Sequence, residues 1–198
     1  MRQKYASDGE RILCHISNFR PVKRVEDVLR VFAKVNAVLP SKLILVGDGP
    51  DRYNCERLCR ELHLCDQVIF LGKVRDTSHV LEMADVFLLP SETESFGLAA
   101  LEAMAVGVPV ISSNTGGIPE VNIHGYSGYL SNVGDIDDMA KNTLELLKPE
   151  NHPTFKKQAK LRSEEKALKF ASIQFSSIGV NIFLNLIFML VLFDPAQP

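Results

Sequence analysis

PSETESFGLAALEAMAVGVP, residues 90–109, decides the fold that this chain is expected to adopt. A strand-like apolar run, Val86 to Leu89, comes directly before it, and a helical run follows from Gly97 to Val106. The order is therefore strand, turn and helix N-terminus. Such a helix end has free backbone N–H groups and the positive end of the helix dipole, so it suits a phosphate.

Two glutamates, Glu94 and Glu102, flank this helix start. Eight helical positions rise roughly 12 Å, about the reach of a nucleoside diphosphate linked to a sugar. Glu94 is then placed to accept hydrogen bonds from the sugar, and Glu102 to accept both ribose hydroxyls. Gly97 would let the backbone approach the phosphates closely. The donor-binding residues predicted between the two acids are Ser95, Phe96, Gly97 and Leu98. The alternative is a surface turn followed by a helix with ordinary exposed carboxylates.

Short apolar segments alternate with amphipathic ones along the rest of the chain. We expect strands near 11–17, 42–46, 67–71, 86–89, 109–112 and 128–130, with helices near 25–39, 51–64, 76–83, 97–106, 118–122 and 135–147. Nearly continuous apolar strands separated by helices indicate a parallel sheet covered on both faces. The predicted fold class is α/β, a Rossmann-like doubly wound sheet with ligands beyond the carboxyl ends of its strands.

The run PSETESFGLAALEAMAVGVPVISSNTGGIPEV, residues 90–121, resembles the donor-site signature of retaining GT-B glycosyltransferases of family 4. The whole region from Ile12 to about Leu147 resembles the C-terminal, nucleotide-sugar-binding half of that fold. ISNFRPVKRVEDVLRVF and LPSETESFGLAALEAMA are most similar to the members that transfer N-acetylglucosamine to L-malate in bacillithiol biosynthesis. The resemblance implies a hexosyltransferase with UDP-N-acetylglucosamine as donor, a hydroxyl acceptor such as that of L-malate, and retention of configuration.

A basic segment, SNFRPVKR, follows the first strand and brings Arg20, Lys23 and Arg24 near a carboxyl end. Cations there would stabilise a departing diphosphate as its charge develops. Many relatives have Gly-Arg where this chain has Ser17 and Asn18. By resemblance, Lys23 matches the family's lysine, Arg20 is a shifted partner, and both act with Glu94 as the catalytic set. A solvated basic loop is the equally weighted alternative.

Three further loops are implied in the site by resemblance. Gly47 and Asp48, in VGDGP, would line the nucleotide, and the backbone at Val74 would read the uracil edge. SNTGGIPE, residues 113–120, would lie next to the donor sugar. The G-x-G of VGDGP has neither the third glycine of a dinucleotide site nor the lysine of a P-loop, which argues against a nicotinamide or ATP site.

Neither a metal nor another cofactor is expected. The five histidines lack ligand spacing, and the four cysteines lack the close pairs of a zinc site, so we interpret them as structural or surface residues and as reduced thiols of a cytoplasmic protein. The D-x-D that begins at Asp135 opens a helix and is better explained as a cap. The net charge of −2 argues against nucleic acid as a partner. The expected ligand is a nucleotide-sugar.

The C-terminal part has a different character. We divide the chain into a nucleotide-sugar-binding domain at 1–150, a charged helix at 151–172 and a hydrophobic tail at 173–198. Phe175 to Phe193 contains no charge and is close to the roughly 20 residues that cross a bilayer, although its serines and asparagines weaken that reading. An altered C-terminus is favoured, with a membrane anchor or a packed apolar helix as alternatives. The polar N-terminus gives no signal peptide.

The resemblance also raises the question of whether a donor-binding domain of this kind can catalyse transfer by itself. GT-B enzymes bind the acceptor between two domains of similar size, and this chain starts almost at the donor domain. Three functional hypotheses follow: a complete transferase, a truncated UDP-sugar-binding domain without catalysis, and a subunit that works with a separate acceptor domain.

Overall fold

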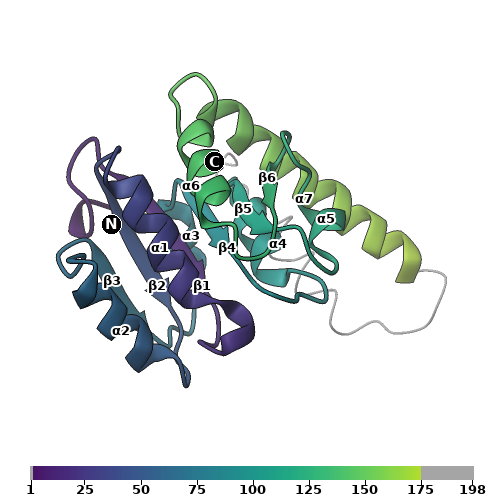
Figure 1. Ribbon diagram of the computed structural model, residues 1–198. Helices are drawn as coiled ribbons and strands as arrows, with labels where there is room; N and C mark the ends of the chain where they lie inside the picture. Colours follow the sequence, from purple (N-terminus) through teal and green to yellow (C-terminus); the bar gives the residue numbers. More distant parts are fainter. Residues whose placement is uncertain (1, 175–198) are drawn as a thin grey trace.

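The computed structural model of the chain describes residues 2–174, with side chains up to Lys169. Six parallel strands form one sheet in the order β3-β2-β1-β4-β5-β6 (Figure 1). The strands are β1 (Arg11–Ile16), β2 (Ser41–Val46), β3 (Val68–Gly72), β4 (Val86–Leu89), β5 (Val110–Ser113) and β6 (Gly128–Ser131). The predicted α/β, Rossmann-like doubly wound fold is confirmed.

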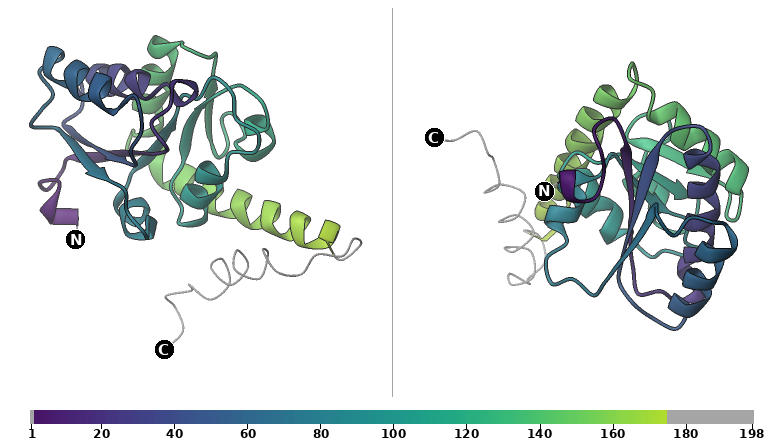
Figure 2. Two further views of the ribbon diagram at one scale, coloured as in Figure 1. Left: turned by 90° about the horizontal axis from the view of Figure 1, so that it is seen from below. Right: turned by 90° about the vertical axis from the view of Figure 1, so that its left-hand side faces the viewer.

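Helices connect successive strands and cover both faces of the sheet (Figure 2). The α-helices are α1 (Val25–Asn36), α2 (Arg52–Glu61), α3 (Ser78–Met83), α4 (Leu98–Ala105), α5 (Ile118–Val121), α6 (Ile136–Leu146) and α7 (His152–Gln174). Two 3₁₀ turns, η1 (Arg2–Lys4) and η2 (Pro21–Lys23), precede β1 and α1. Side chains of α1, α2 and α6 form one apolar core, and those of α3, α4 and α5 form the other.

The strand order reverses between β1 and β4. From β1 the chain builds β2 and β3 on one side, and it then returns to build β4, β5 and β6 on the other. Only two residue pairs join β1 to β4, Leu13 with Val86 and Cys14 with Phe87. The loops that leave the carboxyl ends of these two strands therefore diverge, which is where ligands bind in such sheets.

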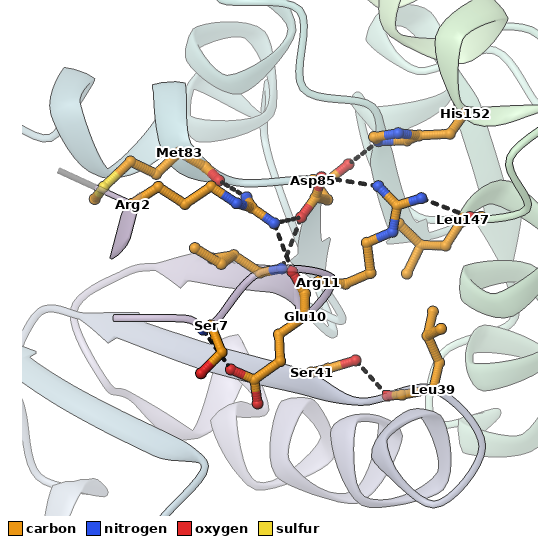
Figure 3. Close-up of polar contacts among 11 residues, drawn as sticks. Arg2, Ser7, Glu10, Arg11, Leu39, Ser41, Met83, Asp85, Leu147 and His152 are labelled. Atoms are coloured by element: carbon orange, nitrogen blue, oxygen red, sulfur yellow. Dashed lines mark hydrogen bonds and ion pairs between the residues drawn. The ribbon is translucent and has the colours of Figure 1, made fainter. Parts of the chain in front are cut away.

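A polar network holds the opposite, amino edge of the sheet (Figure 3). Asp85 is 7% exposed, and its Oδ2 lies 2.7 Å from Arg2 Nη2 and accepts the Ile12 N–H at 2.7 Å. Its Oδ1 lies 3.3 Å from Arg11 Nη1, and its backbone carbonyl contacts His152 Nε2 at 2.9 Å. This cluster fastens the N-terminal segment and the start of α7 to β4.

Several helix boundaries differ from those predicted, and for α2 and α3 the reason is local. α2 ends at Glu61, before the predicted 64, because His63 is left-handed (φ 56°) and Leu64 N–H bonds the Cys59 carbonyl in a Schellman-type stop. α3 starts at Ser78 because Asp76 accepts the Ser78 N–H. α1 stops at Asn36, before the predicted 39, and α7 starts at His152, one residue after the predicted 151.

Other predictions concern the termini and capping. Asp135 Oδ1 accepts the Asp138 N–H at 3.0 Å, which confirms it as the N-cap of α6. No helix within residues 2–174 is long and apolar enough to cross a membrane. The apolar run at 175–193, on which the membrane alternative rests, lies outside the described residues. Cys14, Cys55, Cys59 and Cys65 are all free thiols.

Candidate functional site

A hollow of about 430 Å³ opens beside the carboxyl ends of β4 and β5. The turn η2 forms one side, and the loops after β4 and β5 form the others. Its lining residues are Val22, Lys23, Thr93, Glu94, Ser95, Gly116 and Gly117. The fold thus brings together the basic segment, the first acid of the pair and the Gly-Gly turn, as their sequence positions predicted.

An ion pair crosses this hollow. Lys23 Nζ lies 2.6 Å from Glu94 Oε2, and the two side chains are 21% and 17% exposed. The Ser91 hydroxyl, from a fully buried residue, lies 3.4 Å from the same oxygen. The 2.6 Å charge-assisted hydrogen bond between Lys23 and Glu94 holds both side chains at the rim. Ser91 is a residue that sequence reasoning did not single out.

Backbone hydrogen bonds join the three loops. Glu92 N–H donates to the Val22 carbonyl at 2.8 Å, which ties the loop after β4 to η2. Gly117 N–H donates to the Glu94 carbonyl at 2.9 Å, and the Thr115 hydroxyl donates to the Glu92 carbonyl at 3.0 Å. The position of the Glu94 backbone is therefore set by both neighbouring loops.

The Gly-Gly turn permits this approach. A Cβ on Gly116 would lie 2.1 Å from the Glu94 carbonyl oxygen, and one on Gly117 would lie 2.3 Å from that of Ser95. No real side chain fits at such distances. SNTGGIPE therefore needs its glycines because the backbone of the loop after β4 presses directly against them.

The start of α4 is open. Gly97 is its N-cap, in the left-handed conformation (φ 78°), and no side chain caps the first turn. A Cβ on Gly97 would lie 2.6 Å from Ile118 Cδ1, so packing as well as conformation requires glycine here. Leu98, the first helical residue, is 56% exposed. Among the described side chains, none therefore accepts a hydrogen bond from the first N–H groups of this helix.

Glu102 lies one turn further along the same face of α4 as Leu98. Its side chain is exposed while Leu101 and Ala103 on either side are buried. Within the described part of the chain, its carboxylate makes no hydrogen bond or ion pair. Desolvation by nearby protein atoms raises the pKa of Glu102 above its ordinary value. A carboxylate in that state gains from a ligand that donates hydrogen bonds to it.

The loops after β1, β2 and β3 also leave the carboxyl edge of the sheet, but their predicted site residues Ser17, Gly47, Asp48 and Val74 do not line the hollow. Gly47 (φ 124°) packs so closely that a Cβ would lie 1.7 Å from the Ser17 carbonyl oxygen, and its N–H bonds the Gly72 carbonyl at 2.8 Å. Asp48 Oδ1 accepts the Gly49 N–H at 2.9 Å. Val74 follows β3 and is 38% exposed. These predicted nucleotide-lining positions are therefore adjacent loop residues at one edge.

The three cations of the basic segment have different surroundings. Lys23 faces Glu94, whereas Arg24 Nε contacts Asp27 Oδ2 at 2.5 Å and belongs to the start of α1. Arg20 is exposed, and among residues 2–174 its guanidinium has no hydrogen bond or ion pair. Only Arg20 therefore remains fully available to a ligand.

His15 is buried at the end of β1, beneath this site. Its Nδ1 lies 2.8 Å from the Leu88 carbonyl oxygen and its Nε2 2.7 Å from Ser17 Oγ. Burial lowers its pKa to about 4. Sequence reasoning missed this link, because a histidine within an apolar strand is normally interpreted as an ordinary core residue.

Comparison with known proteins identifies the family. Residues 1–167 match the family described as glycosyl transferases group 1. The chain belongs to this family. It is 51% identical over 151 residues to the N-acetyl-alpha-D-glucosaminyl L-malate synthase of Bacillus anthracis, covering 76% of this chain and 40% of the relative. It is 34% identical over 146 residues to the D-inositol 3-phosphate glycosyltransferase of Mycolicibacterium smegmatis, covering 70% and 33%.

Solved structures share the fold. A mutant of S. aureus TarM, in complex with fondaparinux, alpha-GlcNAc-glycerol and UDP, superposes with a TM-score of 0.76 at 25% identity, over 80% of this chain and 33% of that one. Anabaena HepE, in complex with UDP and glucose, gives 0.78 at 23% identity, over 89% and 51%. This group 1 chain therefore spans at most about half of each relative named here.

Proposed function

We propose that this chain binds a UDP-sugar in the hollow between η2 and the loops after β4 and β5, as the donor half of a retaining GT-B glycosyltransferase. The donor is UDP-N-acetylglucosamine and the acceptor a hydroxyl, with L-malate as the first candidate. The observation that carries the proposal is the Lys23–Glu94 pair at this hollow, in the loop that leads into a helix start with no side-chain cap among the described residues. The 51% identical relative, named as a glucosaminyl malate synthase, supports the choice of sugar and acceptor.

The diphosphate would lie over the start of α4. The backbone N–H groups of Phe96, Gly97 and Leu98, with the helix dipole, favour negative charge there. Lys23 would exchange the Glu94 carboxylate for a phosphate oxygen, and exposed Arg20 would approach from the solvent side. Because negative charge grows on the leaving phosphate as the glycosidic bond breaks, these donors stabilise the transition state more than the ground state.

The carboxylates would hold the two ends of the donor. Once Lys23 turns to the diphosphate, Glu94 is free to accept hydrogen bonds from sugar hydroxyls. Glu102 would accept both ribose hydroxyls, and its raised pKa supports this role, because a desolvated carboxylate gains from hydrogen-bond donors. Ser95 extends the sugar side. The nucleoside would extend beyond the hollow, along the same edge of the sheet, to Ser17, Gly47, Asp48 and Val74.

Retention follows from attack on the same face that the diphosphate leaves. The departing phosphate oxygen takes the acceptor's proton, so the reaction needs no nucleophile from the protein. We propose no resident metal or other cofactor, because Lys23, Arg20 and the start of α4 already supply positive charge to the leaving group.

Catalytic competence is a separate question, because the chain spans 40% of the B. anthracis relative. Transfer by this chain alone would support a complete transferase. Binding of UDP without turnover would support a non-catalytic UDP-sugar-binding domain. Turnover that appears only when an acceptor domain is added would support a subunit that works with a separate partner.

The experiment is a calorimetric titration of the full chain with UDP, and with NAD as the control. Saturable binding of UDP and none of NAD is the expected result, because the loops lack a dinucleotide fingerprint. A folded sample that fails to bind UDP would contradict the proposed function.

A further inference from the structure

We infer that His15 is a positioning residue, which holds the Ser17 hydroxyl as a hydrogen-bond acceptor toward the ligand at the carboxyl end of β1. The inference rests on the proposed function, since it concerns how the nucleotide-sugar is selected at that edge. It assigns a role to a buried polar pair that the proposed catalytic roles leave unused.

The two contacts of the imidazole determine its tautomer. A carbonyl oxygen can only accept, so the 2.8 Å contact with Leu88 requires the hydrogen on Nδ1. A neutral ring carries one N–H, and Nε2 is therefore an acceptor. The 2.7 Å contact with Ser17 Oγ must then be a hydrogen bond donated by the Ser17 hydroxyl.

The surroundings keep the ring neutral and in place. His15 is fully buried, stacks on Phe87 with ring centroids 6.3 Å apart, and lies 6.4 Å from the Phe19 ring. Burial is the largest cause of its lowered pKa, and the charge of nearby Lys23 lowers the pKa further, while the Leu88 carbonyl opposes both. Both nitrogens are satisfied without a proton being added.

The tautomer of His15 determines which way the Ser17 hydroxyl points, and Ser17 is partly exposed at the carboxyl edge. Its N–H donates to the Val46 carbonyl at 3.1 Å, and its own carbonyl packs against Gly47. With its hydroxyl hydrogen directed to His15, Ser17 can offer a ligand only oxygen lone pairs. It therefore selects a group that donates, such as a base N–H or a sugar hydroxyl, and cannot donate to a phosphate.

The first test measures the tautomer directly. Nitrogen-15 NMR of the ring in the full chain at pH 7 should show Nδ1 protonated and Nε2 free. This readout does not depend on any ligand. A proton on Nε2 would overturn the inference and leave the proposed function standing.

The second test is a double-mutant cycle on UDP affinity. Ser17→Ala should weaken binding about three- to tenfold, the scale of one hydrogen bond. His15→Asn, which keeps a donor near Leu88 but loses the acceptor for Ser17, should weaken it similarly. In the Ser17→Ala background, His15→Asn should cause no further loss of affinity for UDP. His15→Gln, which can restore an acceptor near Nε2, should bind more nearly like the unmodified chain.

A matched control separates positioning from general stability. His152 is also buried and also contacts a backbone carbonyl, but at the amino edge. His152→Asn should lower the melting temperature without changing the affinity for UDP. Additive effects of His15 and Ser17 substitutions, or no effect of Ser17→Ala, would overturn the inference. No UDP binding by the folded, unmodified chain would overturn the proposed function as well.

Discussion

The two edges of the sheet use charge in opposite ways. At the amino edge, Asp85 is buried and is surrounded by two guanidinium groups and a backbone N–H (Figure 3). At the carboxyl edge, Lys23 and Glu94 share one contact at a partly open rim, and no side chain of the described residues caps the start of α4. The first edge is saturated, whereas the second retains unused donors and acceptors.

This difference separates scaffold from site. Charges that satisfy one another inside the protein stabilise the fold and have little left to offer a ligand. Charges at a rim, close to helix N–H groups, can exchange a protein partner for a ligand at small cost. Substitutions at the amino edge should therefore change stability, and those at the carboxyl edge should change binding.

The largest effect is expected at Asp85. Asp85→Asn leaves Arg2 and Arg11 without their carboxylate and should lower the free energy of unfolding by about 3 kcal/mol, the scale for breaking a buried ion pair. Urea denaturation measures this loss. The affinity of the folded protein for UDP should not change, and a large drop in affinity would break the contrast between the edges.

Glu102 should show the reverse behaviour. Glu102→Ala removes the proposed ribose acceptor and should weaken UDP binding by about 1.5–3 kcal/mol, the scale of hydrogen bonds to a charged group. Its side chain is exposed and has no partner among the described residues, so the melting temperature should stay the same. Unchanged affinity in calorimetry would refute the ribose assignment.

Acid should weaken the fold through His15. Its pKa is about 4 in the folded chain against an ordinary 6.5, so between these values the unfolded state binds the extra proton. Stability therefore falls as pH falls, by about 2 kcal/mol between pH 7.5 and pH 5 from this group. Denaturant unfolding at both pH values measures this loss. His15→Gln should make the dependence shallower, and an unchanged slope would contradict the assignment.

The smallest effect distinguishes two neighbouring cations. Lys23→Met should weaken UDP binding by about 1 kcal/mol, because the lost phosphate contact replaces an existing bond to Glu94. Arg24→Met should leave affinity unchanged, since Arg24 is already paired with Asp27. Equal losses in calorimetry would mean that the basic segment acts only through its overall charge.

Much of the site could be predicted because its residues belong to short sequence motifs. The acids on either side of the start of α4, the Gly-Gly turn and the basic segment each follow a strand, and carboxyl ends of parallel strands meet at one edge. Lys23 and Arg24 could not be told apart in this way. Adjacent residues in a turn face different neighbours, and only the packed loops determine which one meets Glu94.

The sequence by itself determined the alternation of strands and helices, the family and the positions of the candidate carboxylates, because these depend on periodicity and short spacings. Only the tertiary structure decided that Lys23 pairs with Glu94, 71 positions away, that Asp85 joins the N-terminal segment to β4, and that His15 orients Ser17. Such contacts are set by the register and packing of distant segments, and no local pattern encodes them.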